Sequence, residues 1–118
     1  MNDDTEIIDR EKEFWSGSVE YYDRWLARDA LMVFPEPAGI LRREEILAGI
    51  RSSHRWAWIE MSDISVARDN AAVVVAYRAR ARKPEAVADY IALVGSVYVS
   101  DVEGWKLTFH QHTPVEQR

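Results

Sequence analysis

The second half of the chain alternates between apolar and other side chains with a period of two. Four stretches rich in Val, Ile, Tyr and Trp show this alternation: WAWIEMSDISVA, NAAVVVAYRARAR, ADYIALVGSVYVS and GWKLTFHQHT. The short segments RDN, KPEAV and DVEG separate them and carry turn-forming residues. A period of two is that of a β-strand, because successive side chains point to opposite faces of a sheet. The sequence therefore predicts a four-stranded antiparallel meander from residue 56 onward.

The first half of the chain predicts helices and two shorter strands. Apolar pairs recur there at spacings of seven, seven and four: Ile7–Ile8, Phe14–Trp15, Tyr21–Tyr22 and Trp25–Leu26. This spacing places one apolar stripe on a helix, and Gly17 interrupts it, so the segment forms either one kinked helix or two short ones. ALMVFPEPAGIL then predicts a strand, a tight turn and a strand, and RREEILAGIRSS predicts a further helix.

The composition predicts one folded domain over residues 1–118. A chain of 118 residues is near the commonest domain size, and 47% hydrophobic with 30% charged residues is typical of a globular protein. We see no linker or repeat that divides it. The predicted order is two helices, two strands, one helix and four strands. This order indicates an α+β protein with its helices on one face of a curved, mainly antiparallel sheet.

Charge and residue usage argue against several classes of function. The net charge is −5, which gives no reason to expect nucleic acid as a partner. No apolar run approaches the roughly 20 residues of a membrane-spanning helix, so we expect no membrane partner. The chain has no cysteine, which removes thiol catalysis and zinc–thiolate sites, and its acidic start MNDDTEIIDREKEF is unlike a signal peptide. We therefore expect a soluble cytoplasmic protein without a cofactor.

The order of these elements resembles the nuclear transport factor 2-like superfamily, in particular its small bacterial branch related to the calcium/calmodulin-dependent kinase association domain and to polyketide cyclase-like proteins. The segments that carry the resemblance are DALMVFPEPAGILRREEILAGI, NAAVVVAYRARA and GWKLTFHQHTP, and it covers nearly the whole chain. The resemblance implies a cystatin-like cone, in which a strongly curved sheet wraps around the N-terminal helix, leaves a pocket at its wide end and commonly dimerises through its outer face. It implies no single function, because the same cone carries isomerases, dehydratases, cyclases, hydrolases and proteins without chemistry.

The third of the four long strands has two apolar faces. One face carries Tyr90, Ala92, Val94, Ser96 and Tyr98, and the other carries Ile91, Leu93, Val97 and Val99. Helices can cover one face, and a second chain is the simplest cover for the other, which predicts a homodimer through the outer sheet face. We assign the row with hydroxyl groups to the pocket, because ligand pockets combine apolar walls with a few polar groups. The reverse assignment stays open.

Two histidines, His110 and His112, lie two residues apart on the last predicted strand. Strict alternation puts both on the outer face and turns Gln111 inward. A metal site on the outer face would need one or two further ligands from a neighbour, and the only other histidine, His54, lies in a predicted loop. We therefore expect these histidines to form no metal site.

The predicted ligand pocket combines aromatic side chains with one amide: Trp56, Trp58, Tyr77, Tyr90, Tyr98 and Gln111. The Gln111 amide offers one acceptor and two donors at the end of an apolar wall, which would orient a carbonyl or carboxylate compound. Aromatic residues on strands belong to the core more often than to a pocket wall, so each of them also has a purely structural interpretation.

No complete catalytic set can be assembled from the inward rows of the last three strands, because their polar residues are Tyr, Ser, Gln and Thr. Glu60 and Asp63, on opposite faces of the first long strand, remain as candidates for a base. Three functions stay open. We prefer binding of a small hydrophobic molecule in the pocket. The alternatives are an isomerase, dehydratase or cyclase that acts on a hydrophobic carbonyl compound, and a structural dimerisation module.

Overall fold

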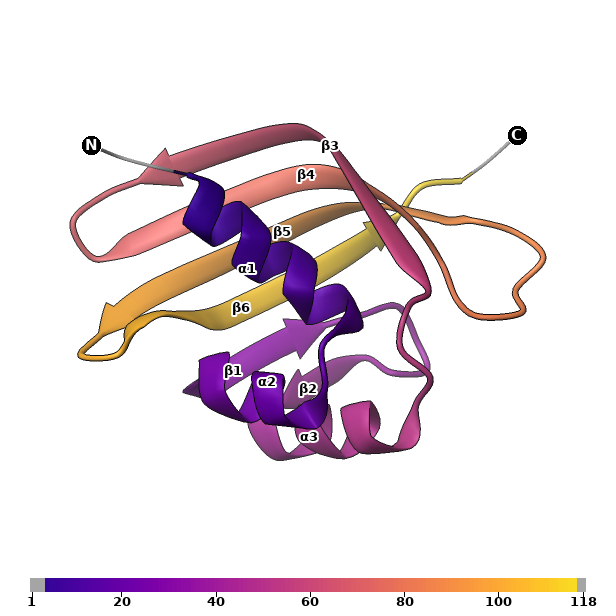
Figure 1. The fold of residues 1–118 in the computed structure, drawn as a ribbon, viewed down its shortest axis with the longest axis horizontal. Coiled ribbons are helices and arrows are strands. Elements are labelled where there is room, and N and C mark those ends of the chain that lie inside the picture. Colours follow the sequence, from indigo (N-terminus) through magenta and orange to yellow (C-terminus); the bar gives the residue numbers. More distant parts are fainter. Residues whose placement is uncertain (1–3, 117–118) are drawn as a thin grey trace.

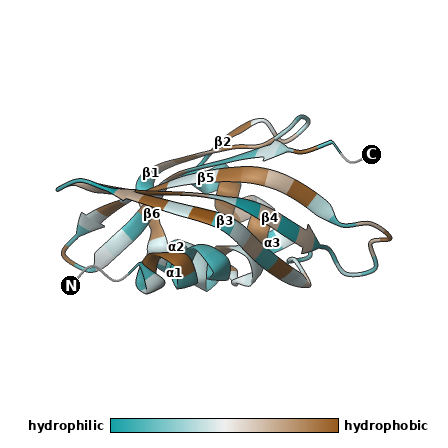
Figure 2. Cartoon of the chain, turned by 90° about the horizontal axis from the view of Figure 1, so that it is seen from above, coloured by the Kyte–Doolittle hydropathy of each residue, from teal (hydrophilic) through white to brown (hydrophobic). Residues whose placement is uncertain are grey.

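In the computed structural model, which describes residues 4–116, three helices pack on one face of a single six-stranded sheet (Figures 1 and 2). The elements in chain order are α1 (Thr5–Ser16), α2 (Val19–Trp25), β1 (Leu26–Val33), β2 (Ile40–Arg42), α3 (Arg43–Ser52), β3 (Trp58–Arg68), β4 (Ala72–Arg82), β5 (Tyr90–Asp101) and β6 (Gly104–Pro114). This order and the α+β class are as predicted. Within the described residues, no helix has the length and apolar character needed to cross a bilayer.

The strands are arranged in the order β2-β1-β6-β5-β4-β3, and the sheet does not close on itself (Figure 1). The last four strands form the predicted antiparallel meander. β1 and β2 are antiparallel to each other, and β1 joins the meander by pairing parallel to β6. The central strands β5 and β6 therefore carry the side chains that face the middle of the concave side.

The N-terminal segment forms two short helices rather than one kinked helix. A Cβ atom at Gly17 would lie 2.7 Å from the carbonyl oxygen of Glu13, so no larger residue fits at the break. The guanidinium of Arg55 donates to the carbonyl oxygens of Phe14 and Gly17, at 2.6 and 3.0 Å. These bonds satisfy carbonyl groups that the end of α1 leaves without a helical partner.

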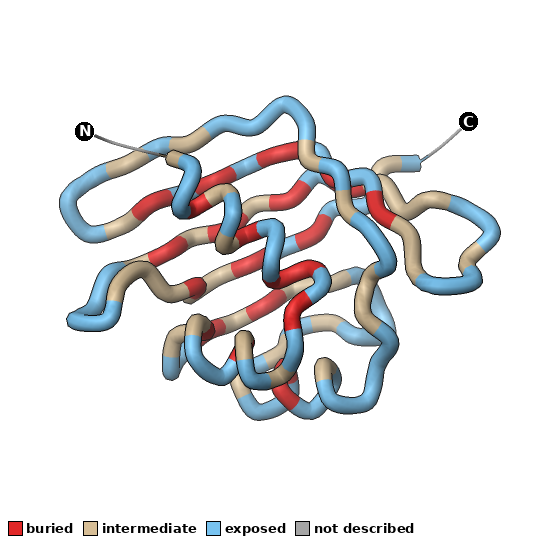
Figure 3. The backbone as a smooth tube through the Cα atoms, viewed as in Figure 1, coloured by how far each residue is buried: buried red, intermediate tan, exposed pale blue. Residues whose placement is uncertain are grey.

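Buried positions alternate with more exposed ones along β4 and β5 (Figure 3), and the buried ones share a core with α1. On β5 the row with hydroxyl groups faces the helices, and its members Ala92, Val94, Ser96 and Tyr98 are buried in the core. α1 contributes Ile7, Phe14 and Trp15 to the same core. The outer face keeps large apolar side chains exposed: Trp58, Val74 and Leu93.

The last strand departs from the predicted alternation. Tyr98 of β5 pairs with Leu107, but Val97 pairs with Phe109, so Thr108 is an extra residue in β6. Such a β-bulge shifts the alternation by one residue and moves every following side chain to the other face.

The bulge corrects our placement of three side chains. His110 and His112 point inward and are only 6% and 8% exposed, whereas Gln111 is exposed on the outer face. The prediction that the two histidines lie outside and Gln111 inside was wrong, because it assumed uninterrupted alternation after Leu107.

Candidate functional site

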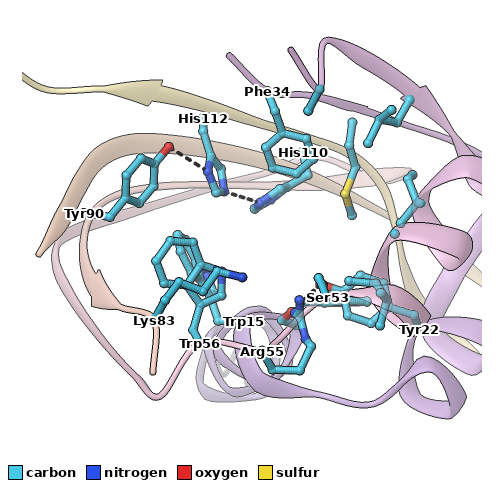
Figure 4. A pocket seen from close by; sticks show the side chains of 17 residues that line it. Trp15, Tyr22, Phe34, Ser53, Arg55, Trp56, Lys83, Tyr90, His110 and His112 are labelled. Atoms are coloured by element: carbon cyan, nitrogen blue, oxygen red, sulfur yellow. Dashed lines mark hydrogen bonds between the residues drawn. The ribbon is translucent and has the colours of Figure 1, made fainter. Parts of the chain in front are cut away.

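A cavity of about 390 Å³ lies between the helices and the concave side of the sheet (Figure 4). Its wall is mostly apolar or aromatic, with Phe14, Trp15, Tyr22, Met32, Phe34, Ala38, Leu41, Ile46, Gly49, Ile50, Ser53, Arg55, Trp56, Lys83, Tyr90, His110 and His112 as lining residues. No aspartate or glutamate is among these described lining residues. A cavity of this size and character is typical of sites for small organic molecules.

The predicted pocket residues fall in three places. Trp56 and Tyr90 line the cavity, and their rings stack on each other with centroids 5.2 Å apart. Tyr77 and Tyr98 are buried in the core behind its wall. Trp58 is exposed and does not line the cavity.

Gln111 and the two candidate bases lie away from the cavity. Gln111 borders a shallow hollow on the outer face, together with Leu93 and Phe109. Glu60 is exposed on β3, and Asp63 pairs with Arg78 at 3.6 Å.

The centre of the site is a buried carboxylate that the sequence analysis did not single out. Glu11 of α1 is completely buried. Its Oε1 accepts a hydrogen bond from the Tyr98 hydroxyl at 2.6 Å, and its Oε2 accepts bonds from the hydroxyls of Tyr77 and Ser96, at 2.5 and 2.8 Å. A signal for it existed: Glu11 is four residues after Ile7 and three before Phe14, so it belongs to the apolar stripe of α1.

These contacts keep Glu11 ionised. Burial alone would raise its pKa, but the hydrogen bond and electrostatic interaction with His110 and the bonds from Tyr77 and Tyr98 outweigh burial and lower the pKa below its ordinary 4.5. In the opposite direction, burial and the Glu11 charge raise the pKa of Tyr77 and of Tyr98 well above 10. Both phenols therefore stay protonated and act as donors to the carboxylate.

The two inward histidines connect this carboxylate to the cavity wall. His110 Nδ1 lies 2.6 Å from Ser96 Oγ and 3.3 Å from Glu11 Oε2. His110 Nε2 lies 2.8 Å from His112 Nε2, and His112 Nδ1 lies 3.1 Å from the Tyr90 hydroxyl (Figure 4). One continuous series of hydrogen bonds thus runs from the core to the cavity, and we call Glu11, Ser96, His110, His112 and Tyr90 the proton chain.

Aromatic side chains hold His112 in place within the cavity wall. Its ring stacks on Trp15 with centroids 4.9 Å apart and planes inclined by 11°, and the edge of Phe34 packs against it at 4.8 Å. Burial, and then the positive charge of His110, lower the pKa of His112 to about 2.

Two basic side chains, Arg55 and Lys83, supply the fixed charge of the cavity wall. The Arg55 guanidinium also donates to the Tyr22 hydroxyl at 2.9 Å. Lys83 Nζ donates to the backbone oxygen of His54 at 2.6 Å and lies 4.6 Å from the centre of a Trp56 ring. Burial, and then the charge of Arg55, lower the pKa of Lys83. With no acidic lining residue, the wall favours an anionic or electron-rich group.

No protein-family model matches the chain, and no curated protein sequence matches it. Solved structures do match. A nuclear transport factor 2-like protein from Cytophaga hutchinsonii is 21% identical with a TM-score of 0.81, and the match covers 98% of this chain and 100% of that one. A candidate calcium/calmodulin-dependent kinase II association domain from Exiguobacterium sibiricum is 19% identical with a TM-score of 0.78, over 97% of this chain and 91% of that one. A candidate ketosteroid isomerase from Parabacteroides distasonis is 14% identical with a TM-score of 0.78, over 93% and 86%.

These likenesses show that the chain has the nuclear transport factor 2-like fold, and the predicted resemblance is confirmed at that level. A related structure from Nostoc punctiforme, of a protein of unknown function, carries the description cystatin-like fold. At identities of 14% to 21% the likeness shows the fold alone.

The first prediction concerns Glu11. Glu11→Gln should lower the free energy of unfolding by roughly 3 kcal/mol, because the amide cannot accept from all three hydroxyls of Tyr77, Ser96 and Tyr98 and leaves buried donors without partners. Glu13→Gln, an exposed site on the same helix, should change it by less than about 0.5 kcal/mol. Urea denaturation at pH 7 measures both.

A comparison of the wild type with Glu11→Gln also predicts how the free energy of unfolding depends on pH. Folding lowers the pKa of Glu11. The contribution of its charge to the free energy of unfolding is therefore complete above pH 4.5 and is lost as the pH falls through the lowered pKa. The difference in the free energy of unfolding between the wild type and Glu11→Gln should therefore become smaller below pH 4.5. A difference that stays constant down to acid unfolding would contradict an ionised Glu11.

Proposed function

We propose that the protein binds a small, largely apolar molecule that carries one anionic or strongly hydrogen-bond-accepting oxygen group. The observation that supports this most directly is the cavity of about 390 Å³, whose wall is mostly apolar and whose charged lining residues are Arg55 and Lys83. Apolar walls favour the body of such a molecule through the hydrophobic effect. The two cations favour a negative group at one end.

Different side chains would contact the apolar body of the ligand and its oxygen group. The aromatic rings of Trp15, Phe34 and Trp56 provide flat apolar surface for the body of the ligand. Lys83 has three N–H donors, and its only hydrogen bond to a described residue is the one to His54. Arg55 is held by three bonds, to Phe14, Gly17 and Tyr22, so Lys83 is the more available partner for an oxygen group.

The second prediction tests this division. Lys83→Met should weaken the binding of 2-naphthoate about tenfold, the value of one charge-assisted hydrogen bond, and should leave the uncharged 2-acetonaphthone within about twofold. Quenching of tryptophan fluorescence by the two compounds gives both dissociation constants. Lys12→Met, an exposed site on α1, is the matched control. Failure of both compounds to bind the wild type at millimolar concentration would contradict the proposed function.

The proton chain favours a second candidate function, acid–base catalysis on a bound carbonyl compound. The Tyr90 hydroxyl would turn from His112 to the carbonyl oxygen of the ligand. His112 Nδ1 would then take a proton from the neighbouring carbon, and the C–H electron pair would move toward that oxygen to give an enolate. The proton would be shared with His110 beside Glu11 and returned to carbon, so the step needs no other reactant.

The third prediction separates a catalyst from a binder. In D₂O, the wild type should exchange the methyl hydrogens of 2-acetonaphthone faster than buffer alone, by about 100-fold or more for a positioned base. His112→Phe should lose this exchange, and His54→Phe, an exposed loop site, should keep it. Proton NMR follows the methyl signal. Binding of 2-acetonaphthone without any acceleration would leave binding as the function and remove catalysis.

We also propose that the outer sheet face forms a homodimer. Leu93 is 48% exposed and Val74 is 41% exposed on this face. A hollow of about 360 Å³ on this face is bordered by Leu93, Phe109 and Gln111. Val97 and Val99 lie on the same face of β5 and are half-buried. Apolar side chains gathered on one sheet face are typical of protein interfaces.

The fourth prediction concerns this assembly. Light scattering of the wild type at micromolar concentration should give twice the 13.7 kDa of one chain. Leu93→Glu should give the single-chain mass, because a charge would have to be buried without a partner. Val87→Glu, at a fully exposed position between β4 and β5, should leave the dimer intact. A wild-type mass of one chain would contradict the dimer.

A further inference from the structure

We propose that the cavity binds the oxygen group of its ligand together with one proton, which the proton chain takes up. This inference rests on the proposed binding function and adds to it the charge state in which binding occurs. It follows from how hydrogens can be distributed between His110 and His112, whose Nε2 atoms face each other at 2.8 Å. A bond between two imidazole nitrogens requires a hydrogen on one of them and none on the other.

In the first arrangement both histidines are neutral. Ser96 donates to Glu11, so its oxygen accepts from the Nδ1–H of His110. His110 Nε2 then carries no hydrogen and accepts from the Nε2–H of His112. His112 Nδ1 in turn accepts from the Tyr90 hydroxyl. Every polar atom is satisfied, and the Tyr90 hydrogen points away from any ligand.

In the second arrangement the chain holds one more proton. His110 now carries hydrogens on both nitrogens and forms an ion pair with Glu11, 3.3 Å away. His112 Nε2 must accept, so the hydrogen of His112 moves to Nδ1 and points at the Tyr90 oxygen. The Tyr90 O–H is thereby released and can donate to a ligand in the cavity. Uptake of one proton by His110 in the core thus frees the Tyr90 hydroxyl to act as a donor at the cavity wall.

The change between the two arrangements depends on the groups that surround the two histidines. His110 is faced by Glu11 and Trp15 of α1, Ser96 of β5, His112 of β6 and Phe34 after β1. The groups facing His112 are His110, Trp15, Phe34 and Tyr90.

Arg55 and Lys83 line the same cavity and oppose further positive charge there. A bound anion offsets the positive charge of Arg55 and Lys83, so it favours the second arrangement, which carries one more proton. Because the pKa of His112 is lowered to about 2, the chain takes up one proton and not two.

The fifth prediction uses naphthalene-1-sulfonate as the probe, because its sulfonate stays ionised and any linked proton belongs to the protein. Calorimetric titrations at one pH, in buffers of different ionisation enthalpy, should show up to one proton taken up per probe bound. Because the complex binds more protons than the free protein, affinity should rise as the pH falls, by up to about tenfold per pH unit. His110→Gln should abolish the uptake, and His54→Gln should keep it.

A measurement on the wild type covers the case in which His110→Gln does not fold. Nitrogen-15 NMR of the imidazole rings should show that the nitrogen without hydrogen in His112 changes from Nδ1 to Nε2 when the probe is added. Absence of probe binding would contradict the proposed function itself. Binding without proton uptake, uptake that persists in His110→Gln, or uptake lost in His54→Gln would each overturn the inference while leaving binding intact.

Discussion

The ionised carboxylate of Glu11, completely buried under the sheet, is the constraint that organises this structure. A charge in the core is tolerated only where hydrogen bonds and an opposite charge replace water. Tyr77, Ser96 and Tyr98 supply the hydrogen bonds, and His110 supplies the positive charge when it is protonated. One residue of α1 therefore contacts inward side chains of β4, β5 and β6 and so ties the helix to the sheet.

The same constraint reaches the cavity through the histidines. His110 is in contact with the carboxylate, and His112 is in contact with Tyr90 on the wall, so the charge in the core influences a site that contains no acidic lining residue among those described. Arg55 and Lys83 act from the opposite side of the cavity (Figure 4). The structure thus combines an apolar volume, two fixed cations and a titratable wall, which is the basis of the proposed functions.

Much of this fold can be predicted from the sequence, because strand alternation and helical spacing report directly on which faces are buried. The two faces of β5 follow from its residues. The inward turn of His110 does not, because Thr108 is an ordinary strand residue and nothing in its type marks the bulge. Trp56 lies before β3 begins, so alternation does not govern it. Glu11 could have been predicted from the sequence, since a carboxylate within the apolar stripe of a helix indicates a buried charge.

The most direct test of the account is the titration of the Glu11 side chain by carbon-13 NMR, with its carboxyl signal assigned by comparison with Glu11→Gln. The account predicts that the chemical shift of the carboxyl carbon changes with a midpoint below pH 4.5, the ordinary pKa of a glutamate. A Glu11 carboxyl that takes up its proton above pH 4.5 would mean that burial prevails over its hydrogen bonds. The core would then hold a neutral acid, and the proton chain would lose the charge on which it depends.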